Sequence, residues 1–200
     1  MSRSTPADGS EVDRRQGLID IATALFEREG YPNVGLRAIA SEAGIRPASI
    51  YHHFSSKEEL LYAICLEVTD RFVSSHVEVL DRDDPVASLG RLVELHVIFC
   101  HHHRGAIEVA RREMRELSKE HLHEVMRQRT AYRVAMESHI AHGKKLGVFI
   151  VDDVPLTAIA VVSLLNSVNE WFVKGGRQSI ETVAAGYRRL VVERMLGAAD

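Results

Sequence analysis

A short run of side chains between Pro47 and Lys57 has the chemistry to bind an anionic, hydrogen-bonding partner. Small, hydroxyl, phenol and imidazole groups gather there with no acidic residue among them: Ala48, Ser49, Tyr51, His52 and His53. A solvated surface helix rarely exposes such a set, whereas a helix that meets phosphates and base edges does. These side chains therefore indicate a contact with nucleic acid.

Two short helical patterns joined by a tight turn would position this run. The first repeats apolar residues at helical spacing, and Gly44 then suits a left-handed turn. Pro47 fits the first turn of the second helix, where its missing N–H costs nothing. Ser55 or Ser56 would cap a longer helix, with the following acidic pair as capping-box partners. The layout is that of a helix-turn-helix, although periodicity alone leaves a plain helical hairpin open. The side chains expected to face inward are Leu36, Ile39, Ala40 and Ala43, then Ile50 and Phe54.

The whole pattern resembles the N-terminal domain of the TetR family of bacterial repressors over about residues 14–66. The matching positions are Gly30, Arg37–Ala40, Ala43–Ile45, Ile50–Phe54 and Lys57–Leu60. One departure is Gly35, where the family usually has a threonine cap; glycine is also an acceptable cap. The resemblance implies that Arg37, Ala48 and His52 meet bases. It also implies that Ser49, Tyr51, His53 and Lys57 hold phosphates. The predicted DNA-binding set is Arg37, Arg46, Pro47, Ala48, Ser49, Tyr51, His52, His53 and Lys57.

A second constellation could bind a metal. His96, Cys100 and His103 recur on one helix face, with His101 and His102 beside them. That spacing suits Zn²⁺, and it supports an alternative function as a metal-responsive regulator or a metal-binding helical protein or enzyme. Polar helix ends and a core thiol explain the same residues without a metal. We therefore assign no metal ligands.

Composition limits the classes of function. The chain has 200 residues, 46% hydrophobic and 26% charged, with a net charge of −3. DNA binding must therefore use a local face rather than generic attraction. No phosphate loop or nucleophile–base set stands out, so we expect neither an enzyme nor a cofactor. Cys65 and Cys100 are expected to be buried thiols. No apolar run is long enough to span a membrane, and a cytoplasmic location is expected.

The spacing of apolar residues predicts an all-α protein of about nine helices. Residues 1–10 are expected to be a flexible tail. Residues 11–57 would form a three-helix helix-turn-helix domain, and residues 58–200 an effector-binding and dimerisation domain. Asp153 would cap a helix running to Val173, and Ser179 would cap the last helix. A loop is expected at residues 143–148.

The last two helices predict a homodimer. The helix at about 154–174 is apolar nearly all round, which is typical of a helix covered on every side. A second copy would supply that cover, with Leu165 and Val191 expected in the seam, whereas a simple core is the alternative. The resemblance also implies a dimer that binds a near-palindromic operator in double-stranded DNA.

The resemblance further implies a small-molecule effector enclosed by the middle helices. An ending that contains Trp171 and Phe172, with the histidine-rich helix, resembles the branch of the family that responds to acyl-CoA thioesters. Arg104, Arg111, Arg112 and Arg115 could meet CoA phosphates, or they could pair with neighbouring glutamates. The predicted lining residues are Phe99, Ile107, Met114, Tyr132, Met136, Asn166 and Trp171.

Overall fold

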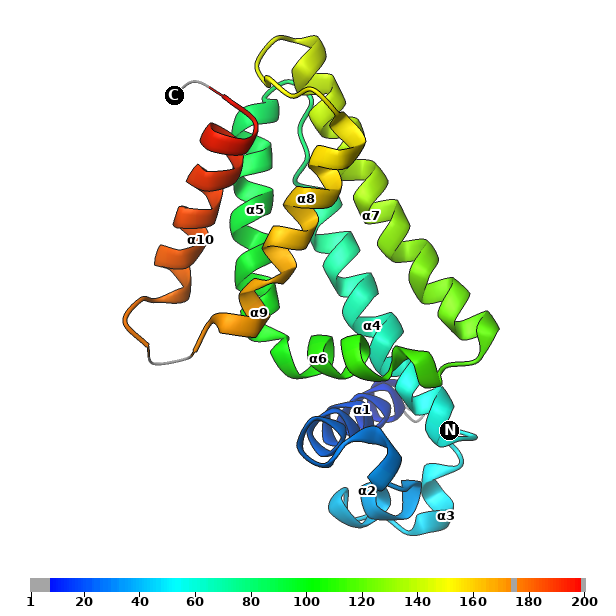
Figure 1. The fold of residues 1–200 in the computed structure, drawn as a ribbon. Coiled ribbons are helices and arrows are strands. Elements are labelled where there is room, and N and C mark those ends of the chain that lie inside the picture. The colour runs from blue at the N-terminus through cyan, green and yellow to red at the C-terminus, as the bar shows by residue number, and fades with distance from the viewer. Residues whose placement is uncertain (1–7, 174–175, 199–200) are drawn as a thin grey trace, which may run out of the picture. The chain divides into compact units, whose positions relative to one another are not determined.

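The structure, a computed structural model, describes residues 8–173 and 176–198. Every regular element in these ranges is helical, which confirms the predicted all-α class (Figure 1). Counting α8 and α9 as one interrupted helix gives the expected nine α-helices in the described part. The chain divides into two compact units. The first holds residues up to Glu67 together with Gly105–His123, and the second holds Val68–Arg104 together with the chain from Glu124 onward.

The first unit contains the helix-turn-helix. Its elements are α1 (Asp8–Glu29), η1 (Tyr31–Asn33), α2 (Leu36–Glu42), α3 (Pro47–Ile50) and the start of α4 (Lys57–Val77). It also contains α6 (Arg104–Glu113) from Gly105 onward, η2 (Met114–Glu116) and the first residues of α7 (Lys119–Lys145). Gly44 has a φ of 66°, which only glycine adopts without strain, and this residue makes the turn between α2 and α3. Phe26, Ile39, Ile50 and Phe54 form a closed core beneath the turn.

The second unit is a helical bundle. It contains α4 from Val68, α5 (Pro85–His102), α7 from Glu124, α8 (Val154–Asn166), α9 (Val168–Trp171), α10 (Ile180–Arg189) and a π-helix (Leu190–Met195). Asp84, Asp153 and Ser179 cap the first turns of α5, α8 and α10 through side-chain oxygens. The predicted caps at Asp153 and Ser179 are thus confirmed.

Several predicted boundaries differ from the structure. The helix expected from Asp153 to Val173 is interrupted at Ser167, whose hydroxyl donates to the Leu164 carbonyl at 2.7 Å and competes with the helical ladder. The loop expected at 143–148 is shorter, because α7 continues to Lys145 and the turn is made at Gly147. Of the predicted tail, residues 1–7 lie outside the described residues, and α1 already begins at Asp8.

The predicted domain boundary after residue 57 also differs from the two compact units. The first unit includes α4 as far as Glu67 and takes in a distant segment, Gly105–His123. Periodicity cannot predict this arrangement, because it identifies helices but not the tertiary contacts between them. In residues 8–173 and 176–198, no helix combines the length and apolar character needed to cross a bilayer.

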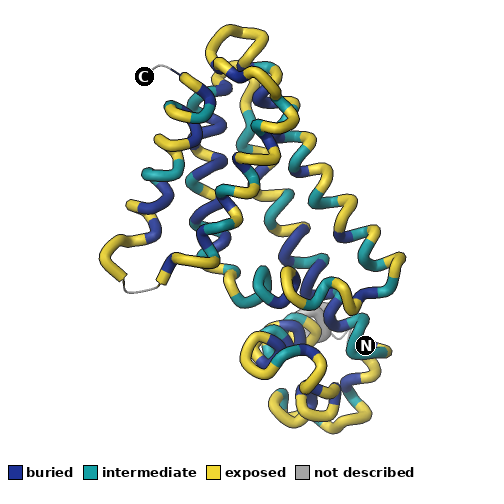
Figure 2. The backbone as a smooth tube through the Cα atoms, in the orientation of Figure 1, coloured by how far each residue is buried: buried dark blue, intermediate teal, exposed yellow. Residues whose placement is uncertain are grey.

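Two residues expected in the dimer seam lie elsewhere. Leu165 and Val191 have no exposed surface within a single protomer, so they belong to its own core. Exposed apolar side chains of the same region include Leu156 and Ile159 on α8 and Leu190 after α10, with exposed fractions of 62%, 47% and 43%. Figure 2 shows α8 and α10 buried on one side and exposed on the other.

Candidate DNA-binding surface and effector-binding interior

The second helix of the motif is short and firmly anchored. α3 begins at Pro47, with Arg46 in extended conformation before it, and the chain then turns through Tyr51–His53. Ile50 and Phe54 are fully buried, as predicted, so the side chains between and before them face outward. Tyr51 is 56% exposed and cannot be a core residue of this unit. The motif therefore presents a small polar surface on a rigid apolar base.

The predicted DNA-contacting side chains differ in solvent exposure and in the contacts that they already make. Six of them are exposed: Arg37, Arg46, Pro47, Ala48, Tyr51 and His52. Ser49 and His53 are half-buried. The Lys57 ammonium group is already bound within the protein. Its Nζ donates to the Tyr31 carbonyl at 2.8 Å and lies 4.2 Å from the centre of the Tyr31 ring. Reaching a phosphate would require this ammonium group to exchange those contacts.

The structure adds one cation that sequence reasoning missed. Arg15, on α1, places its guanidinium 4.9 Å from the centre of the Phe54 ring. It therefore lies beside the turn that carries Tyr51, His52 and His53. The signal was weak in the sequence, because a single arginine on the exposed side of a helix has no distinguishing spacing.

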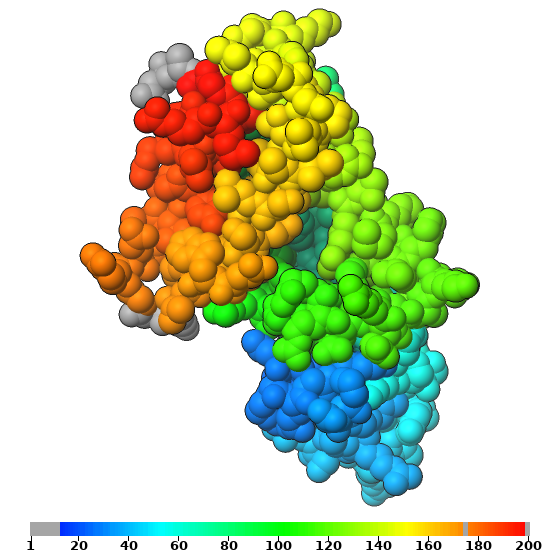
Figure 3. Space-filling model, in the orientation of Figure 1, coloured from blue at the N-terminus to red at the C-terminus, as the bar shows by residue number. Residues whose placement is uncertain are grey.

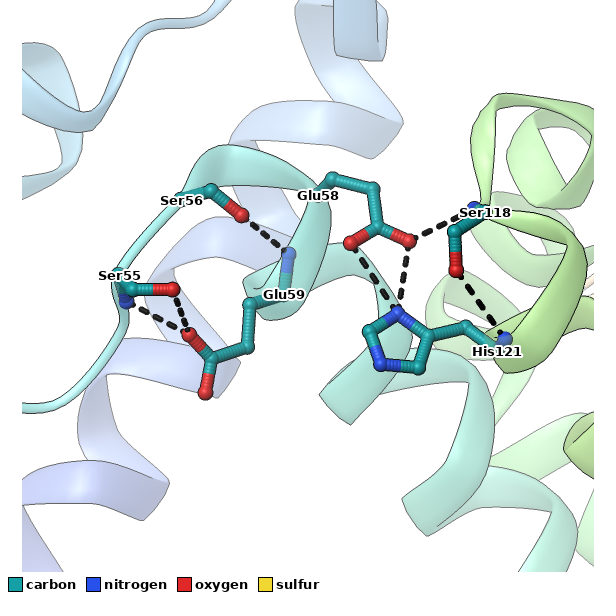
Figure 4. A network of polar contacts seen from close by, with 6 residues as sticks. All are labelled: Ser55, Ser56, Glu58, Glu59, Ser118 and His121. Carbon is teal, nitrogen blue, oxygen red and sulfur yellow. Dashed lines mark hydrogen bonds and ion pairs between the residues drawn. The ribbon is translucent and has the colours of Figure 1, made fainter.

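The start of α4 contains the predicted capping box. The Ser56 hydroxyl accepts from the Glu59 backbone N–H at 3.0 Å, and the Glu59 carboxylate accepts from the Ser55 N–H and hydroxyl at 2.6 Å each (Figure 4). Both hydrogen bonds lower the pKa of Glu59, and the one from the Ser55 hydroxyl has the larger effect. Both serines therefore take part, and Glu59 is the acidic partner.

Glu58 makes a different connection within the same unit. Its carboxylate accepts from the Ser118 backbone N–H at 2.9 Å and contacts His121 Nδ1 at 2.8 Å (Figure 4). The His121 ring stacks on Tyr62 at a centroid distance of 3.8 Å. The helix that follows the helix-turn-helix is thus tied to the beginning of α7.

The second unit encloses a polar chain that runs through three helices. His96 of α5 is fully buried, and its ring contacts the Tyr132 hydroxyl at 3.0 Å and Asn166 Oδ1 at 3.2 Å. Because Asn166 Oδ1 can only accept, we place the ring proton on Nε2, and Nδ1 then accepts from Tyr132. Burial lowers the pKa of His96 to about 3, so the ring is neutral. Burial also raises the pKa of Tyr132.

Aromatic rings surround this chain. The Phe72 ring lies at centroid distances of 4.2 Å from His76, 4.6 Å from both His96 and Tyr132, and 5.3 Å from Phe99. We call Phe72, His76, His96, Phe99 and Tyr132 the ring cluster. The cluster joins α4, α5 and α7 and combines apolar faces with neutral polar edges.

The alternative metal site is not formed. His96 is occupied by Tyr132 and Asn166, and burial raises the pKa of the Cys100 thiol to about 12. The His103 ring packs against Phe99 at 4.1 Å. In the part of the chain that the structure describes, no three His, Cys, Asp or Glu residues are grouped so that they could hold a metal ion. Helical spacing placed the three residues on one face, but their partners differ.

The predicted effector-lining residues are only partly brought together. Phe99 and Tyr132 belong to the ring cluster, Met136 is fully buried one turn after Tyr132, and Asn166 contacts His96. Trp171 is half exposed, and its indole N–H donates to the Tyr187 hydroxyl at 3.0 Å. Two further lining candidates, Ile107 and Met114, belong to the other compact unit.

Sequence reasoning missed two residues of this interior, Phe72 and His76 on α4. They are four positions apart, so they share a helix face. That spacing was the available signal. Arg111 and Arg112 follow the plainer alternative, because Arg111 pairs with Glu108 at 2.8 Å and Arg112 lies 3.6 Å from Glu113. Arg104 instead donates to the Phe172 carbonyl at 3.0 Å.

The short helix α3 is exposed and rests on the buried apolar core of a helix-turn-helix, and the second unit is all-helical. This combination is that of a DNA-binding transcriptional regulator. Residues 18–64 match the family model of the bacterial regulatory proteins, tetR family, and residues 82–195 match that of the tetracyclin repressor-like C-terminal domain. The chain therefore belongs to the TetR family of transcriptional regulators, which are not enzymes.

Similar proteins span nearly the whole chain. The transcriptional repressor KstR2 of Rhodococcus jostii is 29% identical over 193 residues, which are 94% of this chain and 95% of the relative. The TetR-family regulator PfmR of Thermus thermophilus has a TM-score of 0.83 at 30% identity, covering 88% of this chain and 97% of PfmR. The structure of AibR with isovaleryl coenzyme A and operator DNA has a TM-score of 0.80 at 21% identity, covering 90% and 98%, and it supports the fold alone.

Proposed function

We propose that the protein is a ligand-responsive transcriptional repressor that binds a near-palindromic operator as a homodimer. The observation that carries this proposal is the polar surface of α3 and the turn after it, fixed by fully buried Ile50 and Phe54. The repressor function of KstR2, which is similar along nearly its entire length, supports the same conclusion. Because such a protein acts on the chromosome, its place of action would be the cytoplasm.

Within this surface, we assign base contacts to Arg37, Ala48 and His52. Ala48 and His52 are exposed on α3 and in the turn after it, the part of the motif that enters the major groove. Phosphate contacts are assigned to Ser49, Tyr51 and their neighbours at the edge of this surface. Arg46 and Pro47 at the start of α3, with His53 and Lys57 beyond it, complete the predicted set.

Two substitutions separate these roles. Tyr51→Phe should weaken binding to operator and random duplex alike, by about 1 kcal/mol, because a phosphate contact carries no sequence information. His52→Ala should instead reduce the difference in affinity between the operator and point-mutated operators. Fluorescence anisotropy on matched duplexes measures both effects. His123→Ala, an exposed histidine on α7, is the control and should change neither. Equal losses on all duplexes for both variants would contradict the division.

The interior of the second unit supports an apolar effector. The ring cluster offers aromatic faces and neutral polar groups but no buried carboxylate, so it suits an apolar ligand better than a cation. We propose a small apolar or acyl-CoA-type effector. Mycobacterium tuberculosis KstR2, a ketosteroid transcriptional regulator with 25% identity and a TM-score of 0.79, supports this class. AibR, of the same fold, was solved with an acyl-CoA bound.

Release of the operator tests the effector class. The effector would stabilise a conformation in which the two DNA-reading helices no longer match the half-sites, and only its differential affinity can shift that equilibrium. We expect long-chain or steroid-type acyl-CoAs to release operator DNA in an anisotropy titration, and free CoA and Zn²⁺ to leave it bound. Release by Zn²⁺ alone would favour a metal-responsive regulator, and retention with every thioester would reject the acyl-CoA class.

A further inference from the structure

The guanidinium group of Arg15 lies against the helix-turn-helix with its hydrogen-bond donors unused. Arg15 is exposed on α1, and its Cζ lies 4.9 Å from the centre of the Phe54 ring. Among the described residues, no carboxylate comes within ion-pair distance of this group and no acceptor binds its N–H groups. The face of an aromatic ring attracts the positive charge but leaves the five N–H donors available.

The contact with Phe54 places this cation beside the proposed DNA-binding surface. Phe54 directly follows Tyr51–His53, the turn that carries several of the predicted DNA contacts. The Phe54 ring is only 1% exposed, so it is a fixed support, and the guanidinium group that packs on it is held close to the turn. Figure 3 shows the surface of α1 adjoining that of the helix-turn-helix within the first unit. Arg15 therefore borders this surface from a helix outside α2 and α3.

Two neighbouring charges on α4 are less available than Arg15. The Glu59 carboxylate is occupied by the hydroxyl and backbone N–H of Ser55, which are the main causes of its lowered pKa, and the charge of Arg15 contributes less. The Nζ of Lys57 donates to the Tyr31 carbonyl. A phosphate could therefore bind Arg15 without displacing a hydrogen bond, whereas at Lys57 it would have to displace one.

We propose that Arg15 binds a phosphate of the operator backbone and extends the DNA-binding surface onto α1. This inference rests on the proposed function and adds a residue that lies before the segment matched by the N-terminal family model, residues 18–64. The planar donors of a guanidinium group match two oxygens of one phosphate. Packing on a fixed ring also restricts the side chain in advance, which reduces the entropy lost on binding.

The salt dependence of DNA binding tests this assignment on the full-length protein. Fluorescence anisotropy at several KCl concentrations would compare the duplex that the wild type selects from a random library with a scrambled duplex of equal length. Each phosphate contact contributes about 0.9 to the slope of log affinity against log salt concentration. A dimer carries two copies of Arg15, so Arg15→Gln should reduce this slope by about two on both duplexes. Arg15→Lys keeps the charge and should retain most of the slope.

Two further variants separate a phosphate contact from other roles. Arg28→Gln removes the same charge from the last turn of α1, where Arg28 pairs with Glu29 at 2.7 Å, and should leave the slope unchanged. Glu59→Gln keeps a side-chain acceptor for the capping box. If Arg15 only screened the Glu59 carboxylate, the double variant Arg15→Gln with Glu59→Gln would recover the wild-type slope. We expect it to keep the reduced slope.

Urea unfolding of the same variants reports any loss of packing on Phe54, which by itself would lower stability without changing the salt slope. An unchanged slope in Arg15→Gln, an equal loss in Arg28→Gln, or recovery in the double variant would each overturn the assignment while leaving the proposed function intact. If the wild type selects no duplex from the library, the proposed function fails and the inference fails with it.

Discussion

Replacing Ile159 by Asp should convert the protein to a monomer and weaken operator binding by about 10²- to 10⁴-fold. Ile159 and Leu156 lie three positions apart on one face of α8, and both are largely exposed in a single protomer, at 47% and 62%. Leu190, at the start of the π-helix, is 43% exposed. Leu156 and Ile159 share one exposed face of α8, and an exposed apolar face is typical of a subunit interface. A second copy of the chain is the occupant that the proposed function requires.

The size of the effect follows from the operator. A two-fold dimer binds two half-sites, and once one is bound the other is held at a high effective concentration. A charge in the interface would have to be desolvated without a partner, so the variant should dissociate. Each monomer would then bind a single half-site and would lose the gain in affinity that comes from two linked DNA-binding units.

Sedimentation velocity and anisotropy on the same samples check this result. Met126→Asp is the matched control, because Met126 has a similar exposed fraction, 43% against 47% for Ile159, but lies on α7. The control should stay dimeric and retain operator affinity. A dimeric Ile159→Asp variant with normal affinity would place the interface elsewhere. Leu165→Asp is not a suitable test, because Leu165 is buried in its own protomer and the change would disrupt the core.

Acidification from pH 7 to pH 5 should lower the free energy of unfolding by about 2 kcal/mol through His96 alone. Its pKa is lowered to about 3 by burial, against an ordinary value of 6.5. The folded state therefore keeps His96 neutral while the unfolded chain takes up a proton. This contribution is fully present above pH 6.5 and is lost progressively as the pH falls toward 3, by about 1.4 kcal/mol per pH unit. His76 and His139, whose pKa values are also lowered mainly by burial, act in the same direction.

Urea unfolding at pH 7 and pH 5, at one protein concentration, measures this dependence. The free energy of unfolding should differ less between pH 7 and pH 5 in His96→Gln than in the wild type, by about 2 kcal/mol, because one titrating histidine has been removed. Tyr132→Phe is the control, because it removes the hydroxyl that donates to His96 but leaves the histidine buried. That variant should be destabilised at both pH values with little change in the difference. The same pH dependence in His96→Gln and wild type would show that another group is responsible.

Local patterns in the sequence determined the DNA-binding end of this protein. The spacing of Ile50 and Phe54, the turn glycine Gly44 and the serine caps before Glu59 were enough to predict which side chains face outward. This was possible because a helix-turn-helix is built from contacts between residues close in sequence. Helical periodicity and capping rules describe such contacts directly.

Tertiary structure alone decided the interior and the exposed face. Spacing placed His96, Cys100 and His103 on one helix face and left a metal site open as an alternative, but His96 is held by Tyr132 and Asn166, which are 36 and 70 residues away. The sequence predicted Leu165 and Val191 in the dimer interface, but both are buried in the core of their own protomer. Leu156 and Ile159 are exposed instead. An apolar helix position looks the same in sequence whether its own chain or a second copy covers it. The difference arises only when helices distant in sequence pack and take up the available surface, which periodicity along a single helix does not record.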